Sequence, residues 1–152
     1  MAYEIKVMEL PDQPTLVMRD VVAVESLPGF FGKAFGGVMQ YLGELGESPS
    51  GMPFGAYYNL DMSALNIAAG FPVGKPIEGK GEILAEIIPG GKFLSTIYEG
   101  PYDSMEPVYS ALSDYAKEHV LEPTGVVYEY YLNDPGEGPE IIPLTEIRFI
   151  LK

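Results

Sequence analysis

Tyr41-Leu-Gly-Glu-Leu-Gly-Glu-Ser-Pro-Ser-Gly51 is matched 74 residues later by Tyr115-Ala-Lys-Glu-His-Val-Leu-Glu-Pro-Thr-Gly125. Tyr, Glu, Pro and Gly coincide at the same relative places, and a serine lies over a threonine. The register continues without a gap to Tyr57 over Tyr131. A run of this kind predicts an internal duplication. We expect one domain over 1–152, with repeats at about 5–75 and 80–152.

The first half has an apolar, β-branched strand over 15–24, then a helix that starts after Ser26 with Pro28 in its first turn. Further strands are predicted over 52–59 and 66–73, and the Pro- and Gly-rich stretch 74–81 is the expected connector. The helix should bury one stripe of apolar side chains at spacings of three and four, namely Phe31, Phe35, Val38, Leu42 and Leu45.

The second half repeats this order. Strands are predicted over 92–99, 126–132 and 144–151, and a helix is expected to start at Asp103 with Pro107 in its first turn. Segment 134–139 is a polar loop. The buried stripe of this helix should be Met105, Val108, Leu112, Tyr115 and His119. The fold class is therefore α+β: a tandem β-α-β-β repeat forming one curved antiparallel sheet, with two helices on one face and a ligand cleft on the other.

Composition narrows the function classes. The 152 residues carry a formal net charge of −13, so direct nucleic-acid binding is not expected, whereas a cationic partner is. There is no cysteine and one histidine, so we expect neither disulfides nor a metal site nor a cofactor. No apolar stretch is long enough to span a bilayer and no signal-peptide core is present, so the expected location is the cytoplasm, away from membranes.

Several short motifs occur in an order that resembles the GyrI-like small-molecule-binding domains, which also form the effector-binding halves of some bacterial transcription activators and multidrug sensors. The resemblance spans the whole chain and implies binding of lipophilic, often cationic compounds in an aromatic cleft with a carboxylate at its base. We expect a stand-alone member, because no helix-turn-helix precedes the domain. The residues that carry the resemblance are Leu27-Pro28, Phe31, Tyr41-Leu-Gly43, Pro53-Phe54, Tyr57, Ala69-Gly-Phe-Pro-Val73, Gly100-Pro-Tyr102, Tyr131-Leu-Asn-Asp-Pro135 and Thr145-Glu-Ile147.

Glu146 is the leading candidate for the carboxylate. Alternation along 144–151 sends Ile147, Phe149 and Leu151 towards the helices, and Glu146 and Arg148 the other way. Spacing alone also fits a solvated Glu146, or one paired with Arg148. The resemblance favours the role in a pocket, where aromatic walls would desolvate a bound cation.

Tyr57 and Tyr131 are equivalent in the two repeats, so we expect them to flank a flat ligand with their π faces. If Tyr130 packs on the second helix, alternation turns Glu129 and Tyr131 towards the cleft. At an offset of 78, Ala68 lies opposite Glu146 and would offer a small apolar surface. The remaining expected wall residues are Phe54, Phe71, Tyr98 and Tyr102.

Binding of lipophilic, cationic or planar aromatic molecules is the leading functional hypothesis, with no catalytic residue. The first alternative is a hydrolase that opens cyclopropane-type alkylating toxins, as the resemblance suggests, with Glu146 as general base and Tyr131 or Glu129 assisting. Ile142-Pro-Leu144 stands where such relatives often carry Trp, which weakens this reading. The second alternative is an acidic interaction protein that inhibits gyrase. A haem-ligand role for His119 is also considered, but a position on the buried helix stripe argues against it.

Overall fold

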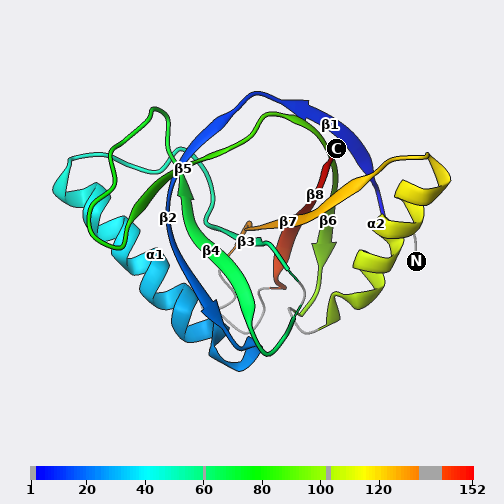
Figure 1. Ribbon diagram of the computed structural model, residues 1–152, viewed down its shortest axis with the longest axis horizontal. Coiled ribbons are helices and arrows are strands. Elements are labelled where there is room, and N and C mark those ends of the chain that lie inside the picture. The colour runs from blue at the N-terminus through cyan, green and yellow to red at the C-terminus, as the bar shows by residue number, and fades with distance from the viewer. Residues whose placement is uncertain (1–2, 60, 102–103, 134–141) are drawn as a thin grey trace. The chain divides into compact units, whose positions relative to one another are not determined.

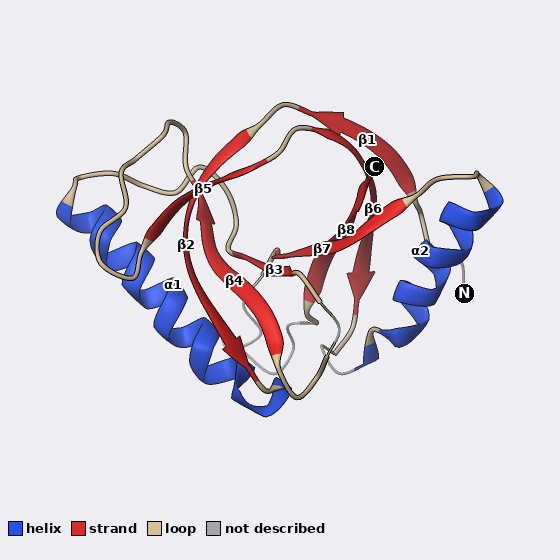
Figure 2. Ribbon diagram, viewed as in Figure 1, coloured by secondary structure: helices blue, strands red, loops and turns tan. Residues whose placement is uncertain are grey.

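The computed structural model describes residues 3–59, 61–101, 104–133 and 142–152 (Figure 1). The chain forms two compact units. The N-terminal unit is the continuous segment Pro11–Gly90, and the C-terminal unit combines Met1–Leu10 with Gly91–Lys152. Each unit holds a four-stranded antiparallel sheet and one long helix (Figure 2). The α+β class and the repeated β-α-β-β order are confirmed.

The N-terminal unit contains β2 (Gln13–Val22), the short 3-10 turn η1 (Val24–Ser26), α1 (Leu27–Glu44), β3 (Phe54–Tyr57), β4 (Leu65–Pro72) and β5 (Leu84–Ile88). Its strand order is β3-β4-β2-β5. Helix α1 lies along β2 and β4 (Figure 1). The C-terminal unit contains β1 (Lys6–Leu10), β6 (Gly91–Glu99), α2 (Glu106–Glu118), β7 (Pro123–Tyr131) and β8 (Leu144–Leu151), in the order β1-β6-β8-β7.

The pairing registers of the two sheets confirm the duplication. Thr15 of β2 pairs with Pro72 of β4, and Phe93 of β6 pairs with Ile150 of β8. The second pair of residues therefore lies 78 positions after the first in both strands. Tyr57 pairs with Ile67 and Tyr131 with Thr145, which gives offsets of 74 and 78. The two offsets inferred from the sequence are therefore the offsets of the sheets. Tyr57 is equivalent to Tyr131, and Ala68 to Glu146.

Strands β1 and β5 were not predicted, and they are exchanged between the repeats. Strand β1 pairs with β6 of the C-terminal unit, and β5 pairs with β2 of the N-terminal unit. Both strands are five residues long and mostly exposed, so neither shows the apolar alternation by which a strand is found in sequence. The compact units consequently differ from the continuous repeats expected at about 5–75 and 80–152.

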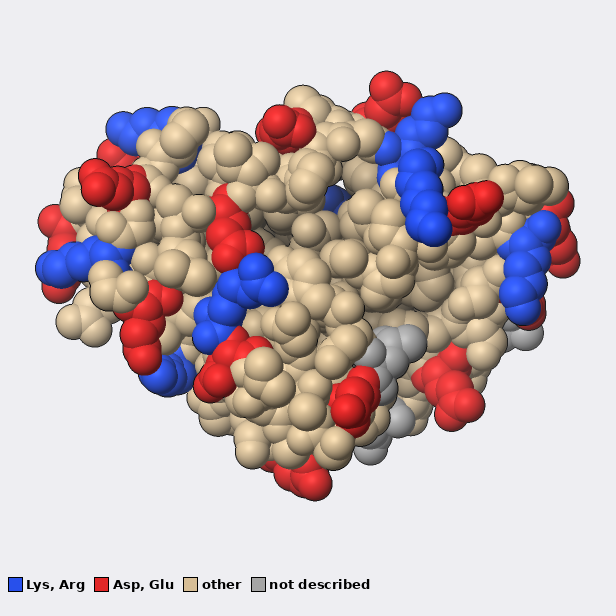
Figure 3. Space-filling view, viewed as in Figure 1, with Lys and Arg blue, Asp and Glu red and all other residues tan. Residues whose placement is uncertain are grey.

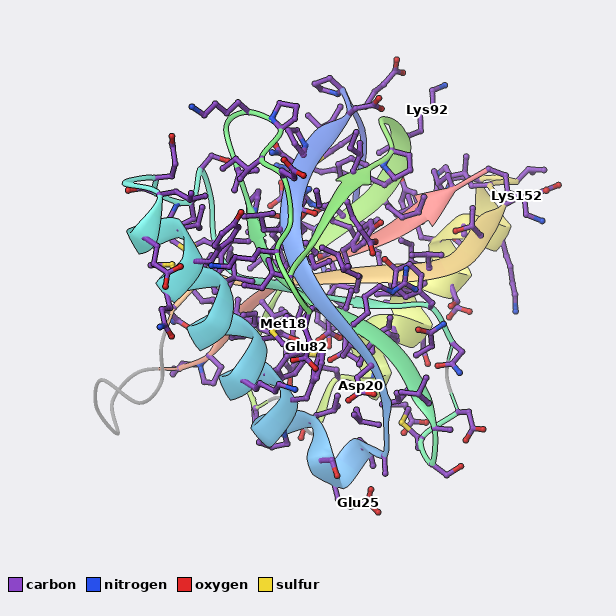
Figure 4. The ribbon with its side chains drawn as sticks, turned by 60° about the vertical axis from the view of Figure 1, so that its left-hand side comes forward. Met18, Asp20, Glu25, Glu82, Lys92 and Lys152 are labelled. Atoms are coloured by element: carbon purple, nitrogen blue, oxygen red, sulfur yellow. The ribbon has the colours of Figure 1, made fainter. Side chains whose placement is uncertain are left out.

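Helix α1 buries a stripe that overlaps the predicted one but is rotated from it. Its buried residues are Phe30, Ala34, Val38 and Leu42, whereas Leu45 is 45% exposed. The side chain of Met18 lies between β2 and α1 (Figure 4). A Cβ on Gly37 would lie 3.3 Å from its sulfur, so the small residues of α1 permit a close approach to the sheet. Ser26 precedes the helix but makes no side-chain capping hydrogen bond, because the chain enters α1 directly from η1.

Helix α2 buries Val108, Leu112 and Ala116, so the predicted stripe is correct for its first two helical positions and wrong for the last two. Tyr115 is half-buried. His119 is exposed at the C-terminal end of the helix, where its ring stacks on Tyr115 with centroids 3.9 Å apart. The expected buried histidine is therefore a surface residue. Asp103 and the loop 134–139 lie outside the described residues.

Candidate functional site

Two glutamates of the C-terminal unit lie on opposite faces of its sheet. Glu129 on β7 is directly opposite Ile147 on β8, whereas Glu146 is directly opposite Tyr130. Directly opposed side chains of an antiparallel pair point to the same face. The Ile147 face is the one covered by α2, because Tyr109 of α2 packs edge-on against Phe149, with ring centroids 5.6 Å apart. Glu129 therefore lies beneath α2 and Glu146 on the other face.

Glu129 forms the helix-side cluster together with Tyr109 and Tyr131. The residue is 7% exposed. The hydroxyl of Tyr131 donates to its Oε1 at 3.1 Å, and the hydroxyl of Tyr109 donates to its Oε2. A carboxylate taken out of water requires such donors to remain charged. The cluster is thus a buried acidic group fixed from both sides by phenols, against the ring of Phe149.

Local sequence places each member of the helix-side cluster. Tyr109 stands in the first turn of α2, next to the buried Val108. Alternation along β7 turns Glu129 and Tyr131 to the same face. The register between β7 and β8 shifts between Pro123 and Val127, next to Gly125, whose φ of 94° suits glycine. This irregularity contributes to setting which β7 residues face the helix.

The opposite face carries the open-face cluster, in which Glu146 is already paired. Arg148 Nε donates to Glu146 Oε2 at 2.6 Å, and Ser95 Oγ donates to the same oxygen at 2.9 Å. The guanidinium carbon of Arg148 lies 4.1 Å from the ring centroid of Tyr130 and 4.9 Å from that of Phe93. The cluster therefore has the composition expected for a bound organic cation, a carboxylate with aromatic faces, but the cation is a side chain of the protein.

Burial dominates the titration of Tyr130 in the open-face cluster. Desolvation raises the pKa of its hydroxyl; the positive charge of Arg148 opposes this rise and the negative charge of Glu146 adds to it. Tyr130 therefore remains a neutral ring surface for the Arg148 guanidinium well into the alkaline range.

The expected grouping of Glu146 with Glu129 and Tyr131 is wrong. The register brings Glu129 and Tyr131 together but turns them to α2, and it is Tyr130 that shares a face with Glu146. The reason is the sequence of β7 near its end, Tyr-Glu-Tyr-Tyr, in which both alternating sets offer a large ring to the core. Pairing of Glu146 with Arg148, which spacing alone allowed, is what the structure has.

The candidate residues of the N-terminal unit are also divided between two faces. Tyr57 packs against the cluster of Met18 and Ile67 on the α1 side, and the ring of Phe71 meets that of Phe35 at 5.7 Å. Ala68 pairs with Ala56 and is directed to the other face. Phe54, opposite Gly70, shares that face. Tyr57 and Ala68 therefore cannot contact a ligand from the same face of this sheet.

Tyr98 forms hydrogen bonds with the backbone of the loop that follows β6. Its hydroxyl donates to the carbonyl oxygens of Pro101 and Ser104, at 2.9 and 3.1 Å, and its ring is buried on the α2 side. Tyr102 lies outside the described residues. Tyr109, which completes the helix-side cluster, was not predicted, because it stands beside the apolar stripe of its helix and no spacing rule singles it out.

The distribution of charged and metal-ligating side chains does not indicate a further site in the described residues. On the face seen in Figure 3, acidic side chains are scattered among basic and uncharged ones. Within the described segments, no group of three His, Asp or Glu side chains is placed to hold a metal ion. No helix in the described part of the chain combines the length and the hydropathy that crossing a bilayer requires.

Solved structures with the same fold include a domain of EcmrR, a protein also solved in complex with DNA. The chain superposes on the crystal structure of the EcmrR C-terminal domain with a TM-score of 0.72 and 20% identity, covering 100% of this chain and 99% of that one. EcmrR in a cryo-EM complex with DNA gives a TM-score of 0.77 at 19% identity, and there the match covers 99% of this chain but only 57% of the EcmrR chain. The chain thus spans little more than half of that protein.

Other neighbours differ in their described roles. SAV2435 bound to tetraphenylphosphonium gives a TM-score of 0.67 at 10% identity, covering 100% of this chain and 94% of that one. A hydrolase from Listeria innocua gives 0.69 at 11% identity, covering 98% and 92%. At these identities the likeness concerns the fold alone. A search of curated proteins found no match. The family model for the GyrI-like small-molecule-binding domain matches residues 3–152, so this chain belongs to the GyrI-like family.

Proposed function

We propose that this protein binds lipophilic organic cations, and that Glu129 of the helix-side cluster is their anchor. The observation that carries the proposal is a carboxylate only 7% exposed, held by Tyr109 and Tyr131 beside the ring of Phe149. Burying an acidic group is costly unless charge and hydrogen bonds compensate it, so such a site favours a positive ligand. Aromatic faces add cation–π attraction and apolar contact.

The comparison of the two clusters favours Glu129 over Glu146. A ligand at Glu146 would have to displace Arg148, which is held by the 2.6 Å ion pair and by two ring faces. At Glu129 two of the groups that hold the carboxylate are the neutral hydroxyls of Tyr109 and Tyr131, and neither of them is a cation that a ligand would have to displace. Binding of tetraphenylphosphonium by SAV2435, which has the same fold, supports a cation as the ligand class.

The test is a calorimetric titration with tetraphenylphosphonium and with triphenylphosphine oxide, a neutral molecule of similar aromatic character. We expect the cation to bind more tightly. Glu129→Gln, which keeps the shape and the hydrogen-bond acceptor, should weaken the cation by about 1–3 kcal/mol, roughly 5- to 150-fold, and leave the neutral molecule nearly unchanged.

Glu146→Gln is the matched control, because it makes the same change in charge on the same sheet but at a carboxylate already paired with Arg148. Its effect on the cation should stay within about 0.5 kcal/mol. Equal losses in the two variants would mean that only the overall charge matters. Equal affinity of the wild-type protein for the two ligands would contradict the proposal itself.

A further inference from the structure

Thr145 on β8 carries a buried polar atom that the fold itself does not satisfy. Thr145 is 0% exposed. Among the described residues, its Oγ1 is the one buried side-chain oxygen or nitrogen without a hydrogen-bond partner. An unpaired buried hydroxyl destabilises a protein, because it gives up its hydrogen bonds to water without replacing them. Such groups are rare in native proteins and need a reason at each position.

The position of Thr145 connects it to the helix-side cluster. It is directly opposite Tyr131 on β7 and directly opposite Tyr98 on β6, so the three side chains share the α2 face. Both flanking tyrosines send their hydroxyls elsewhere, Tyr131 to Glu129 and Tyr98 to backbone carbonyls. Glu129 is the next residue of β7 on this face, so the unpaired hydroxyl and the buried carboxylate are diagonal neighbours.

Other buried hydroxyls of the same unit are satisfied. Thr96 on β6, which also faces α2, is 2% exposed and donates to the carbonyl oxygen of Glu4 at 2.9 Å. Ser95, on the opposite face, donates to Glu146. The buried Ser95 and Thr96 hydroxyls of this sheet thus have hydrogen-bond partners. The Thr145 hydroxyl, which lies diagonal to Glu129, has none.

We infer that Thr145 is a specificity-determining residue that accepts a hydrogen bond from the ligand, so that the site selects cations bearing several N–H groups. A primary ammonium or an amidinium on an aromatic body can donate one N–H to Glu129 and another to Thr145 Oγ1. A fully alkylated cation has the same charge but leaves Thr145 unpaired. This inference rests on the proposed function, because it concerns the ligand of the same site.

The probes are 1-naphthylmethylamine, protonated at neutral pH, and its N,N,N-trimethyl derivative, titrated by calorimetry into the full chain. The quantity measured is the ratio of the two affinities. Thr145→Val removes the hydroxyl at nearly constant volume and should lower the ratio in favour of the primary amine by about five- to tenfold. Thr145→Ser, which retains the hydroxyl, should preserve the ratio.

Thr96→Val is the matched control: the same substitution on the same face at a hydroxyl that is already paired. It should lower the thermal stability and leave the affinity ratio unchanged, whereas Thr145→Val should not lower the thermal stability of the ligand-free protein. If both probes bind and Thr145→Val leaves their ratio unchanged, the inference is overturned while cation binding stands. If neither probe nor tetraphenylphosphonium binds, the proposed function fails and the inference falls with it.

Discussion

At the scale of single residues, alternation predicts the strands well and fails where both alternating sets are apolar. In β8 the buried Ile147 and Phe149 alternate with Glu146 and Arg148, as expected, because charged side chains mark one set. In β7 each set contains a tyrosine, so only the pairing register reveals which of Glu129 and Tyr130 faces α2. The types of the site residues were therefore predictable, but not their grouping. Thr145 gave no signal at all, since an unpaired hydroxyl cannot be recognised in sequence.

Tyr130 gives the open-face cluster a measurable pH dependence. Burial raises the pKa of Tyr130 above its ordinary value of 10.0, so the unfolded chain releases this proton at lower pH than the folded one. The corresponding stability is fully present below pH 10.0 and is lost as the pH rises through the folded pKa, by at most about 1.4 kcal/mol per pH unit. Urea unfolding from about pH 9 to about pH 11 should show a steeper loss for the wild type than for Tyr130→Phe. Parallel curves would show that Tyr130 is not the group responsible.

At the scale of elements, composition predicts the long helices and central strands, whereas contacts between elements decide their details. The Gly-rich α1 is a weak helix by intrinsic propensity, yet it extends over 18 residues because Phe30, Ala34, Val38 and Leu42 pack on the sheet. The same packing explains why the buried stripe is rotated from the predicted one. Ala34 lies in the core with Met18, and a Cβ on Gly37 would lie 3.3 Å from the Met18 sulfur, so small residues that an apolar pattern does not select face the sheet.

Gly70 is the position where two strands approach too closely for any side chain. It pairs with Val17, and a Cβ built on it would lie 1.9 Å from the carbonyl oxygen of Leu16. Gly70→Ala should force β2 and β4 apart and reduce the free energy of unfolding by about 3 kcal/mol or more. Gly74→Ala, where a Cβ meets nothing within 4 Å, should change it by less than about 0.5 kcal/mol. Chemical denaturation measures both, and similar values for the two variants would refute the steric argument.

At the scale of the whole molecule, the duplicated units are linked by exchanged strands. The chain passes from β1 in the C-terminal unit to β2 in the N-terminal unit, and from β5 back to β6, each time through a short connection that contains a proline. In one of these connections the amide of Gly90 donates to Asp12 Oδ1 of the other at 2.5 Å. The sequence predicts the repeat, because similar residues still recur at offsets of 74 and 78 positions. It does not predict the exchange, because pairing partners of short, exposed strands are set only in the folded sheet.

The exchange predicts that damage to either outer strand appears in the unit that is distant in sequence. In β1, Val7 pairs with Leu94 and Met8 with Phe93 of β6. The equivalent residues of β5 lie 78 positions later. There, Ala85 pairs with Leu16 and Glu86 with Thr15 of β2. Since alternate amides of an edge strand point towards the sheet, changing both neighbours to proline removes at least one ladder donor.

Hydrogen exchange distinguishes the exchanged arrangement from two ordinary hairpins. The double proline variant at residues 7 and 8 should speed exchange in β6 by about tenfold or more, which corresponds to about 1.4 kcal/mol of local opening, and leave the pairing of β2 with β4 protected. The variant at residues 85 and 86 should loosen β2 and spare the pairing of β6 with β8. In a chain of simple hairpins the first variant would loosen β2 and the second β6, so the opposite pattern would rule out the exchange. The pairs lie on equivalent strands, so each variant controls for the general effect of proline in the other.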